Sequence, residues 1–370
     1  MMKRVVSLLS AMVLGVLVTT ASAGHADTLP ANRYQVANLV SDVPGAAANL
    51  DPNLVNAWGL TSGPTTPWWV SDNGTDRSTL YDGTGIAIPL VVKVPGAPTG
   101  AVFNGGSRFV VSHEGFSGPS RFLFATEFGT IRGWNPGVPP PAPSTKAFNV
   151  VNRHGAGAVY KGLAIATGTE GDLLYATDFV NGRVDVFNSA FNRVHKKDFV
   201  DPNLPSGYGP FGIQAINGTI FVTYAKQDPT STDEIHGPGL GFVDMFDPEG
   251  QFLGRVASRR ALNAPWGLAW APADFGRFSG DLLVGNFGDG RINAYAPEAN
   301  GGFERAGVLR GAGGVPITID GLWALEFGTG SVSGSTNSLF FHIPIPTCLS
   351  RSSSCLEATD KLCNAPKARP

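Results

Sequence analysis

The sequence predicts an all-β fold, a six-bladed β-propeller made of four-stranded blades. A Gly followed by an apolar run recurs six times with spacings between 41 and 62 residues, at Gly59, Gly100, Gly162, Gly212, Gly267 and Gly321. Gly and Pro are abundant while only 15% of residues are charged, which favours short strands joined by tight turns over helices. A repeat of this length that contains several short strands is typical of a propeller.

The N-terminus has the pattern of a secretory signal peptide. Lys3 and Arg4 precede an apolar run over residues 5–20, and Ala21-Ser22-Ala23 forms a small-residue cleavage site. We therefore expect a signal peptide over residues 1–23 and export to the periplasm or the extracellular medium. No later run reaches eighteen apolar residues, so we expect no membrane span in the mature chain.

The charge of the chain argues against a nucleic-acid partner. Lys and Arg total 27 residues and Asp and Glu total 29, which gives a net charge of −2. No basic stripe is present, and binding to a polyphosphate needs one.

The third and fifth repeats give the clearest blades. In each, four short apolar runs are separated by Gly, Asn or Asp, as expected of antiparallel strands with tight turns. The expected strands cover residues 162–167, 172–179, 183–188 and 196–200 in the third blade, and 267–271, 281–287, 291–296 and 303–309 in the fifth.

The third strand of a blade carries a second recurring pattern, Gly-x-(Val/Ile)-x-x-aromatic. It begins at Gly129, Gly182, Gly241 and Gly290. The Gly permits the positive φ of a tight hairpin. The aliphatic and aromatic positions lie on opposite faces of the strand, so each is expected to pack against a different neighbouring blade.

The last repeat supplies only two clear strands, over residues 321–327 and 338–342. An apolar segment, Tyr34–Val40, precedes the first blade. We expect it to form the outer strand of the sixth blade, because a strand from one terminus that completes the last blade closes the ring and protects its edge. Residues 34–342 would then form one propeller domain.

The C-terminal tail, residues 343–370, differs in composition from the repeats. It lacks strand periodicity, and we expect it to be disordered or altered by a frameshift. All three cysteines lie in this tail, at Cys348, Cys355 and Cys363. In an exported protein one pair can oxidise and leave one thiol free.

Several segments together carry a family resemblance: Asp51-Pro-Asn-Leu-Val-Asn-Ala-Trp-Gly-Leu60, Phe124-Ala-Thr-Glu-Phe-Gly-Thr-Ile-Arg-Gly-Trp-Asn-Pro136 and Ala264-Pro-Trp-Gly-Leu-Ala269. Over residues 34–341 the chain resembles a family of secreted bacterial propeller proteins of uncharacterised function, some with a PEP-CTERM sorting tail. It is more distantly similar to NHL-repeat and gluconolactonase-like propellers. The resemblance implies the fold and export, and implies no activity.

The residues that precede the six repeat glycines are the candidate ligand site. They are Trp58, Thr99, Lys161, Phe211, Trp266 and Asp320. They are expected at the mouth of the central channel, where Trp58, Lys161, Phe211, Trp266 and Asp320 would bind a small ligand such as a sugar ring. The alternative is that the aromatic residues fill the channel as packing.

A second set of polar residues ends the second strands, at Asp72, Glu127, Asp178 and Asn286. An insertion over residues 226–240 adds Asp228, Asp233, Glu234 and His236. If these ends converge, their oxygens would suit Ca²⁺. The alternative is that each residue stabilises its own turn, and we expect no cofactor on that interpretation.

The sequence favours an exported binding module over an enzyme. Its partner would be a small molecule, a glycan or a protein of the cell envelope or extracellular space. A metal-dependent hydrolase of the lactonase type is the alternative, because gluconolactonase-like propellers hold a divalent metal in the channel that would polarise a lactone carbonyl. Among the residues that precede the inner strands, only Asp320 and Asn56 suit a metal here. A structural matrix component is a third possibility.

Overall fold

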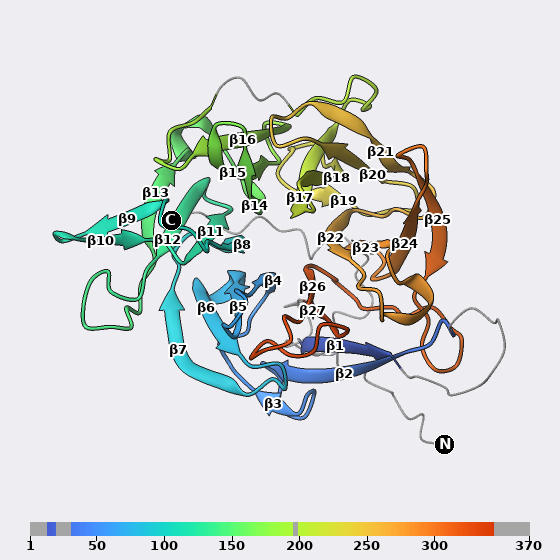
Figure 1. The fold of residues 1–370 in the computed structure, drawn as a ribbon, viewed down its shortest axis with the longest axis horizontal. Coiled ribbons are helices and arrows are strands. Elements are labelled where there is room, and N and C mark those ends of the chain that lie inside the picture. Colours follow the sequence, from blue (N-terminus) through green and yellow to red (C-terminus); the bar gives the residue numbers. More distant parts are fainter. Residues whose placement is uncertain (1–12, 20–30, 195–198, 344–370) are drawn as a thin grey trace, which may run out of the picture.

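The protein is a β-propeller with a central axis, as the computed structural model shows (Figure 1). The structure describes residues 13–19, 31–194 and 199–343, without the side chains of residues 13–19 and 343. Five blades, each made from one continuous segment of chain, surround the axis. A further sheet combines strands from both ends of the chain and lies between the first and fifth blades (Figure 1).

The first two blades have four antiparallel strands each. Blade one contains β4 (Ala57–Thr61), β5 (Trp68–Asp72), β6 (Arg77–Tyr81) and β7 (Ala87–Lys93), with the short 3-10 helix η1 (Asn73–Thr75) between β5 and β6. Blade two contains β8 (Pro98–Phe103), β11 (Phe122–Thr126), β12 (Thr130–Trp134) and β13 (Phe148–Asn152). A separate hairpin, β9 (Val110–His113) and β10 (Phe116–Pro119), projects outward from it (Figure 1).

The other three blades follow in chain order. Blade three, which η2 (His154–Ala156) precedes, contains β14 (Tyr160–Gly168), β15 (Gly171–Asp178) and β16 (Arg183–Asn188). Blade four contains β17 (Tyr208–Ile216), β18 (Thr219–Gln227), β20 (Gly241–Phe246) and β21 (Phe252–Ser258), with the short β19 (Glu234–Ile235) paired to β18. Blade five contains β22 (Pro265–Trp270), β23 (Leu282–Asn286), β24 (Ile292–Pro297) and β25 (Phe303–Val308), with η3 (Gly276–Phe278) between β22 and β23.

The all-β propeller is confirmed, but the prediction of six four-stranded blades closed by an N-terminal strand is wrong. The described part of the chain forms five blades. The remaining sheet has the order β26 (Leu325–Phe327), β27 (Leu339–Ile343), β1 (Val13–Thr19), β2 (Tyr34–Ser41) and β3 (Asn49–Leu50). It departs from the blade pattern because β27 pairs with β1 rather than with β2, and β3 lies parallel at the edge.

Two sequence predictions lie wholly or largely outside the described residues. The predicted signal peptide covers residues 1–23, of which the structure describes only the backbone of β1. The predicted tail after residue 343 and its three cysteines also lie outside the described residues, as does most of the expected outer strand at residues 196–200 of blade three.

The repeat glycines bring the innermost strands into direct backbone contact. A Cβ added to Gly59 would lie 2.3 Å from the carbonyl oxygen of Thr99, and one on Gly212 would lie 2.1 Å from that of Trp266. On Gly267 it would lie 2.4 Å from the carbonyl oxygen of Trp323. Real Cβ atoms do not approach that closely, so the recurring Gly is required by close packing around the axis.

The apolar faces of adjacent blades pack together and form the core. One buried cluster joins Leu163 and Tyr160 of β14 to Leu123 of β11 and Ile131 of β12, as the predicted third-strand pattern requires. Another joins Phe221, Val243 and Met245 of blade four to Leu268 and Val284 of blade five. Within the described part of the chain, no helix has the length and apolar character needed to cross a membrane.

A buried polar position recurs in the third strands of three blades. It is occupied by Asp185, Asp244 and Asn293, and each side chain meets an Arg from a neighbouring segment. Arg193 Nη2 lies 2.7 Å from Asp185 Oδ1, and Arg255 Nε lies 2.7 Å from Asp244 Oδ1. The Arg contacts compensate the burial of these side chains, because a buried carboxylate or carboxamide is costly without a partner.

Candidate functional site

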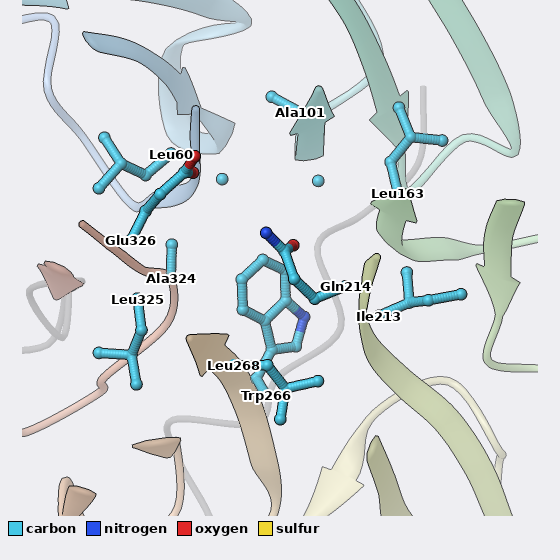
Figure 2. A pocket seen from close by; sticks show the side chains of 12 residues that line it. Leu60, Ala101, Leu163, Ile213, Gln214, Trp266, Leu268, Ala324, Leu325 and Glu326 are labelled. Carbon is cyan, nitrogen blue, oxygen red and sulfur yellow. The ribbon is translucent and has the colours of Figure 1, made fainter. Parts of the chain in front are cut away.

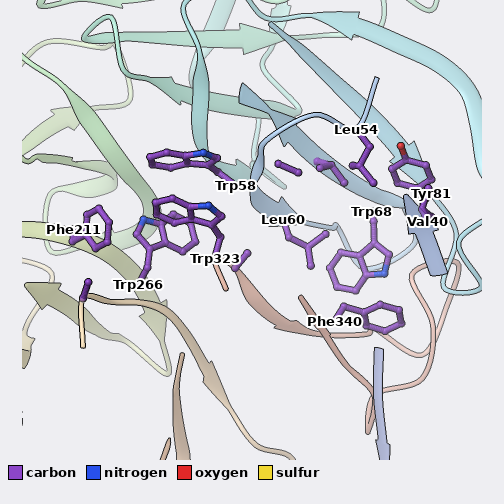
Figure 3. Close-up of a cluster of buried hydrophobic side chains, with 14 of the residues drawn as sticks. Val40, Leu54, Trp58, Leu60, Trp68, Tyr81, Phe211, Trp266, Trp323 and Phe340 are labelled. Carbon is purple, nitrogen blue, oxygen red and sulfur yellow. The ribbon is translucent and has the colours of Figure 1, made fainter. Parts of the chain in front are cut away.

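Four buried aromatic side chains, Trp58, Phe211, Trp266 and Trp323, meet on the axis (Figure 3). The half-buried Phe287 packs against them, and we call these five residues the axial cluster. Trp323, 2% exposed, lies at its centre. Its ring stacks on Trp58 with centroids 3.6 Å apart and on Phe287 at 4.1 Å. Trp266 and Phe211 approach it at 5.6 Å each. The predicted aromatic platform is therefore largely covered by its own members.

Trp323 was not among the predicted site residues, although the sequence contains a signal for it. The carbonyl oxygen that contacts Gly267 belongs to Trp323, just as that of Trp266 contacts Gly212. Trp323-Ala324-Leu325 therefore occupies the place of Trp58-Gly59-Leu60 and Trp266-Gly267-Leu268. The prediction instead aligned Gly321 and selected Asp320, whose side chain is exposed.

A network of polar side chains lies against this cluster, and we call it the mouth network: Lys161, Glu127, Asp233, Asn73 and Asn56. Lys161 Nζ donates to Glu127 Oε1 at 2.9 Å and to Asp233 Oδ1 at 3.4 Å. Asn73 Nδ2 donates to Glu127 Oε2 at 3.0 Å, and Asn56 Nδ2 donates to Asn73 Oδ1 at 2.8 Å. The network therefore joins the second-strand ends of the first two blades to β14 and the insertion of blade four.

Lys161 also ties the network to the aromatic residues. Its Nζ lies 5.0 Å from the centroid of the Trp58 ring, within the range of a cation–π contact. Its backbone carbonyl accepts a hydrogen bond from Trp266 Nε1 at 3.3 Å. The side chain is only 1% exposed, so Lys161 links the mouth network to the axial cluster from inside the protein.

The charge state of Lys161 follows from its surroundings. Burial opposes its charged form, but the nearby carboxylates of Glu127, Glu234 and Asp233 outweigh burial and raise the pKa of Lys161 above its usual range. Lys161 is therefore a fixed cation rather than a nucleophilic amine, because nucleophilic catalysis by Lys requires a depressed pKa.

The insertion of blade four contributes the exposed part of the site. The side chains of Asp233 and His236 are 73% and 47% exposed. His236 Nε2 lies 3.3 Å from Glu234 Oε1, and its ring packs edge-on against Phe287 at 4.9 Å. On the blade-two side, Glu127 is 29% exposed and the next residue, Phe128, is 56% exposed.

The structure does not bring the four predicted metal ligands together. Glu127 belongs to the mouth network, whereas Asp178 pairs with Arg183 Nη2 at 3.1 Å and accepts from Asn181 Nδ2 at 2.8 Å. Asn286 donates to Ala261 O and to Asp289 Oδ1. Asp72 is fully buried, and burial raises its pKa well above the usual value. These contacts are those of residues that stabilise turns and strand ends.

The residues at the mouth do not fit the divalent metal that the gluconolactonase-like resemblance implies. Among the described residues, no group of three or more His, Cys, Asp or Glu is placed to hold a metal. Glu127, the half-buried carboxylate of the mouth network, already faces the Lys161 ammonium. The fixed positive charge of Lys161 beside this carboxylate opposes the binding of a divalent cation there.

No protein-family model matches the chain. Among solved structures, it is similar to a gluconolactonase from Xanthomonas campestris, with 15% identity, a TM-score of 0.38, and coverage of 61% of this chain and 83% of that one.

Two relatives share much more sequence. Uncharacterized protein L690 of Acanthamoeba polyphaga mimivirus is 37% identical over 305 residues, which are 79% of this chain and 78% of that protein. Uncharacterized protein R648 of the same virus is 35% identical over 305 residues, covering 79% and 73%. The bacterial origin and the PEP-CTERM tails of the resembled family find no support in these viral relatives. The chain belongs to the family of propeller proteins that includes these two mimivirus proteins.

Proposed function

We propose that the protein is an exported binding module that holds a glycan at the mouth network. The observation that supports this most strongly is the combination of a rigid interior with an exposed polar rim. Lys161 and the four central aromatic residues of the axial cluster are buried, whereas Asp233 and His236 of the blade-four insertion are exposed. Phe128, which follows Glu127 in blade two, is exposed as well.

Sugar recognition suits this combination of groups. Carboxylate oxygens accept hydrogen bonds from sugar hydroxyls, and an exposed aromatic ring covers the apolar face of a sugar. The ion pair between the buried Lys161 and the half-buried Glu127 holds one acceptor in place, so little side-chain freedom is lost on binding.

The direct test is to measure binding of soluble envelope and extracellular-matrix oligosaccharides by isothermal titration calorimetry. We expect saturable binding to at least one of them, weakened roughly tenfold or more by Asp233→Asn and by Phe128→Ala. Glu304→Gln is the matched control, because Glu304 is an exposed residue of β25. Binding that neither mouth variant changes would reject this site.

A hydrolase of the lactonase type is the competing function, and the same protein preparation tests it. On the binding proposal, glucono-δ-lactone is hydrolysed at the uncatalysed rate with or without added divalent metal. Turnover that a chelator abolishes and that Glu127→Gln also abolishes would overturn the binding proposal.

A further inference from the structure

A second polar site lies further along the axis than the mouth network. The innermost strands enclose a cavity lined by backbone at Gly59 and Gly100 and by apolar side chains, including Leu163 and Leu268. Apart from Trp266, the described residues that line the cavity include two with polar side chains, Gln214 and Glu326. Figure 2 shows both of them directed into the central space.

These two residues occupy equivalent positions in their strands. Gln214 lies two residues after Gly212 in β17, and Glu326 lies two residues after Ala324, which stands in the place of the repeat Gly. Lys161 lies one residue before Gly162. The cavity is therefore separated along the strands from the mouth network, and it does not depend on the proposed glycan site.

Neither polar group has a partner in the described part of the chain. No hydrogen bond or ion pair joins the Glu326 carboxyl or the Gln214 carboxamide to another described residue. A carboxyl group enclosed by apolar side chains and backbone is costly unless a partner compensates it. Glu326 is half-buried, and this burial raises its pKa to about 8.

We propose that this cavity binds one small monovalent cation, of the size of Na⁺ or K⁺, between Glu326 and Gln214. The water-accessible volume of about 20 Å³ admits one particle of the size of a water molecule. The donors, a carboxylate and a carboxamide oxygen, are hard ligands for an alkali cation. A single carboxylate balances one positive charge, whereas Ca²⁺ sites use several charged oxygen ligands.

The test compares thermal unfolding of the full chain in NaCl, KCl and tetramethylammonium chloride at constant ionic strength and pH 8.5. Tetramethylammonium is too large for the cavity. A ligand that binds only the folded state raises Tm with its concentration. We expect Tm to rise by roughly 2–4 °C when Na⁺ or K⁺ replaces tetramethylammonium, with saturation as the cation concentration increases.

Glu326→Gln keeps the shape of the side chain and removes its charge, so it should abolish this rise. The control Glu304→Gln should retain it. An equal cation response in Glu326→Gln, or no response in the wild type, would overturn the proposal. Saturable stabilisation by submillimolar Ca²⁺ that Glu326→Gln removes would also overturn it, because the site would then be divalent.

Crystals soaked in Rb⁺ provide a second measurement that does not depend on the variant folding. An anomalous peak beside the Glu326 carboxylate supports the site, and full Rb⁺ exchange with no peak there contradicts it. These results are independent of glycan binding, so failure of one proposal leaves the other standing.

Discussion

Trp323→Ala is the substitution with the largest predicted effect on stability. The side chain is 2% exposed and contacts Trp58, Phe287, Trp266 and Phe211. Replacing a buried Trp with Ala costs about 3–5 kcal/mol, and its stacked pairs on Trp58 and Phe287 place this site near the top of that range. We expect a loss of about 4–5 kcal/mol from the free energy of unfolding.

The assay is unfolding in guanidinium chloride followed by far-UV circular dichroism, since the substitution alters Trp fluorescence directly. Trp270→Ala is the matched control, because Trp270 is half-buried and meets Phe303 edge-on at 6.3 Å. It should lose about 1–2 kcal/mol. If Trp323→Ala lost no more than Trp270→Ala, the assignment of Trp323 to the centre of the molecule would be refuted.

Three further predictions concern the scaffold and the channel. Gly212→Ala places a Cβ 2.1 Å from the Trp266 carbonyl oxygen, so it should lower the free energy of unfolding by about 3 kcal/mol or more. The control is Gly155→Ala, whose added Cβ meets nothing within 4 Å. In the same denaturation assay this control should stay within about 0.5 kcal/mol of wild type. Asp185→Asn weakens the pairing of a buried carboxylate with Arg183 and Arg193, so it should lower the free energy of unfolding by about 3 kcal/mol. The control Asp274→Asn changes an exposed residue and should have no effect. Equal denaturation midpoints for the two variants would contradict this prediction. In tetramethylammonium buffer, native Glu326 retains a proton between pH 4.5 and about 8 that the unfolded chain has released. The free energy of unfolding should therefore fall as pH rises through that window, by up to about 1.4 kcal/mol per pH unit, and an equal slope in Glu326→Gln would refute the assignment.

The blade strands could be read from the sequence because their patterns are local. Alternation, turn residues and the recurring Gly marked β14 to β16 and β22 to β25 to within a few residues. The predicted number of blades was wrong because these local patterns do not continue through the last repeat. The last repeat yields only β26 and β27, and the adjoining strand β1 lies in a segment whose composition indicates a signal peptide.

The candidate site depends on contacts between different blades, which the spacing of residues in the sequence does not reveal. Lys161 reaches Glu127 across 34 residues and Asp233 across 72. The sequence analysis expected Lys161 at the channel mouth and singled out the insertion with Asp233 and His236. No sequence signal paired them, since partners on different blades are set by the geometry of the ring rather than by a motif.

The central claim is that the buried Lys161 and the half-buried Glu127 form an ion pair that holds the channel mouth together. A double-mutant cycle with Lys161→Met and Glu127→Gln measures it most directly. We predict that Lys161→Met alone costs about 3–5 kcal/mol, because it leaves clustered carboxylates without their cation, and that the coupling energy is about 1.5 kcal/mol or more. A coupling energy within about 0.5 kcal/mol of zero, the level expected of independent sites, would contradict the claim.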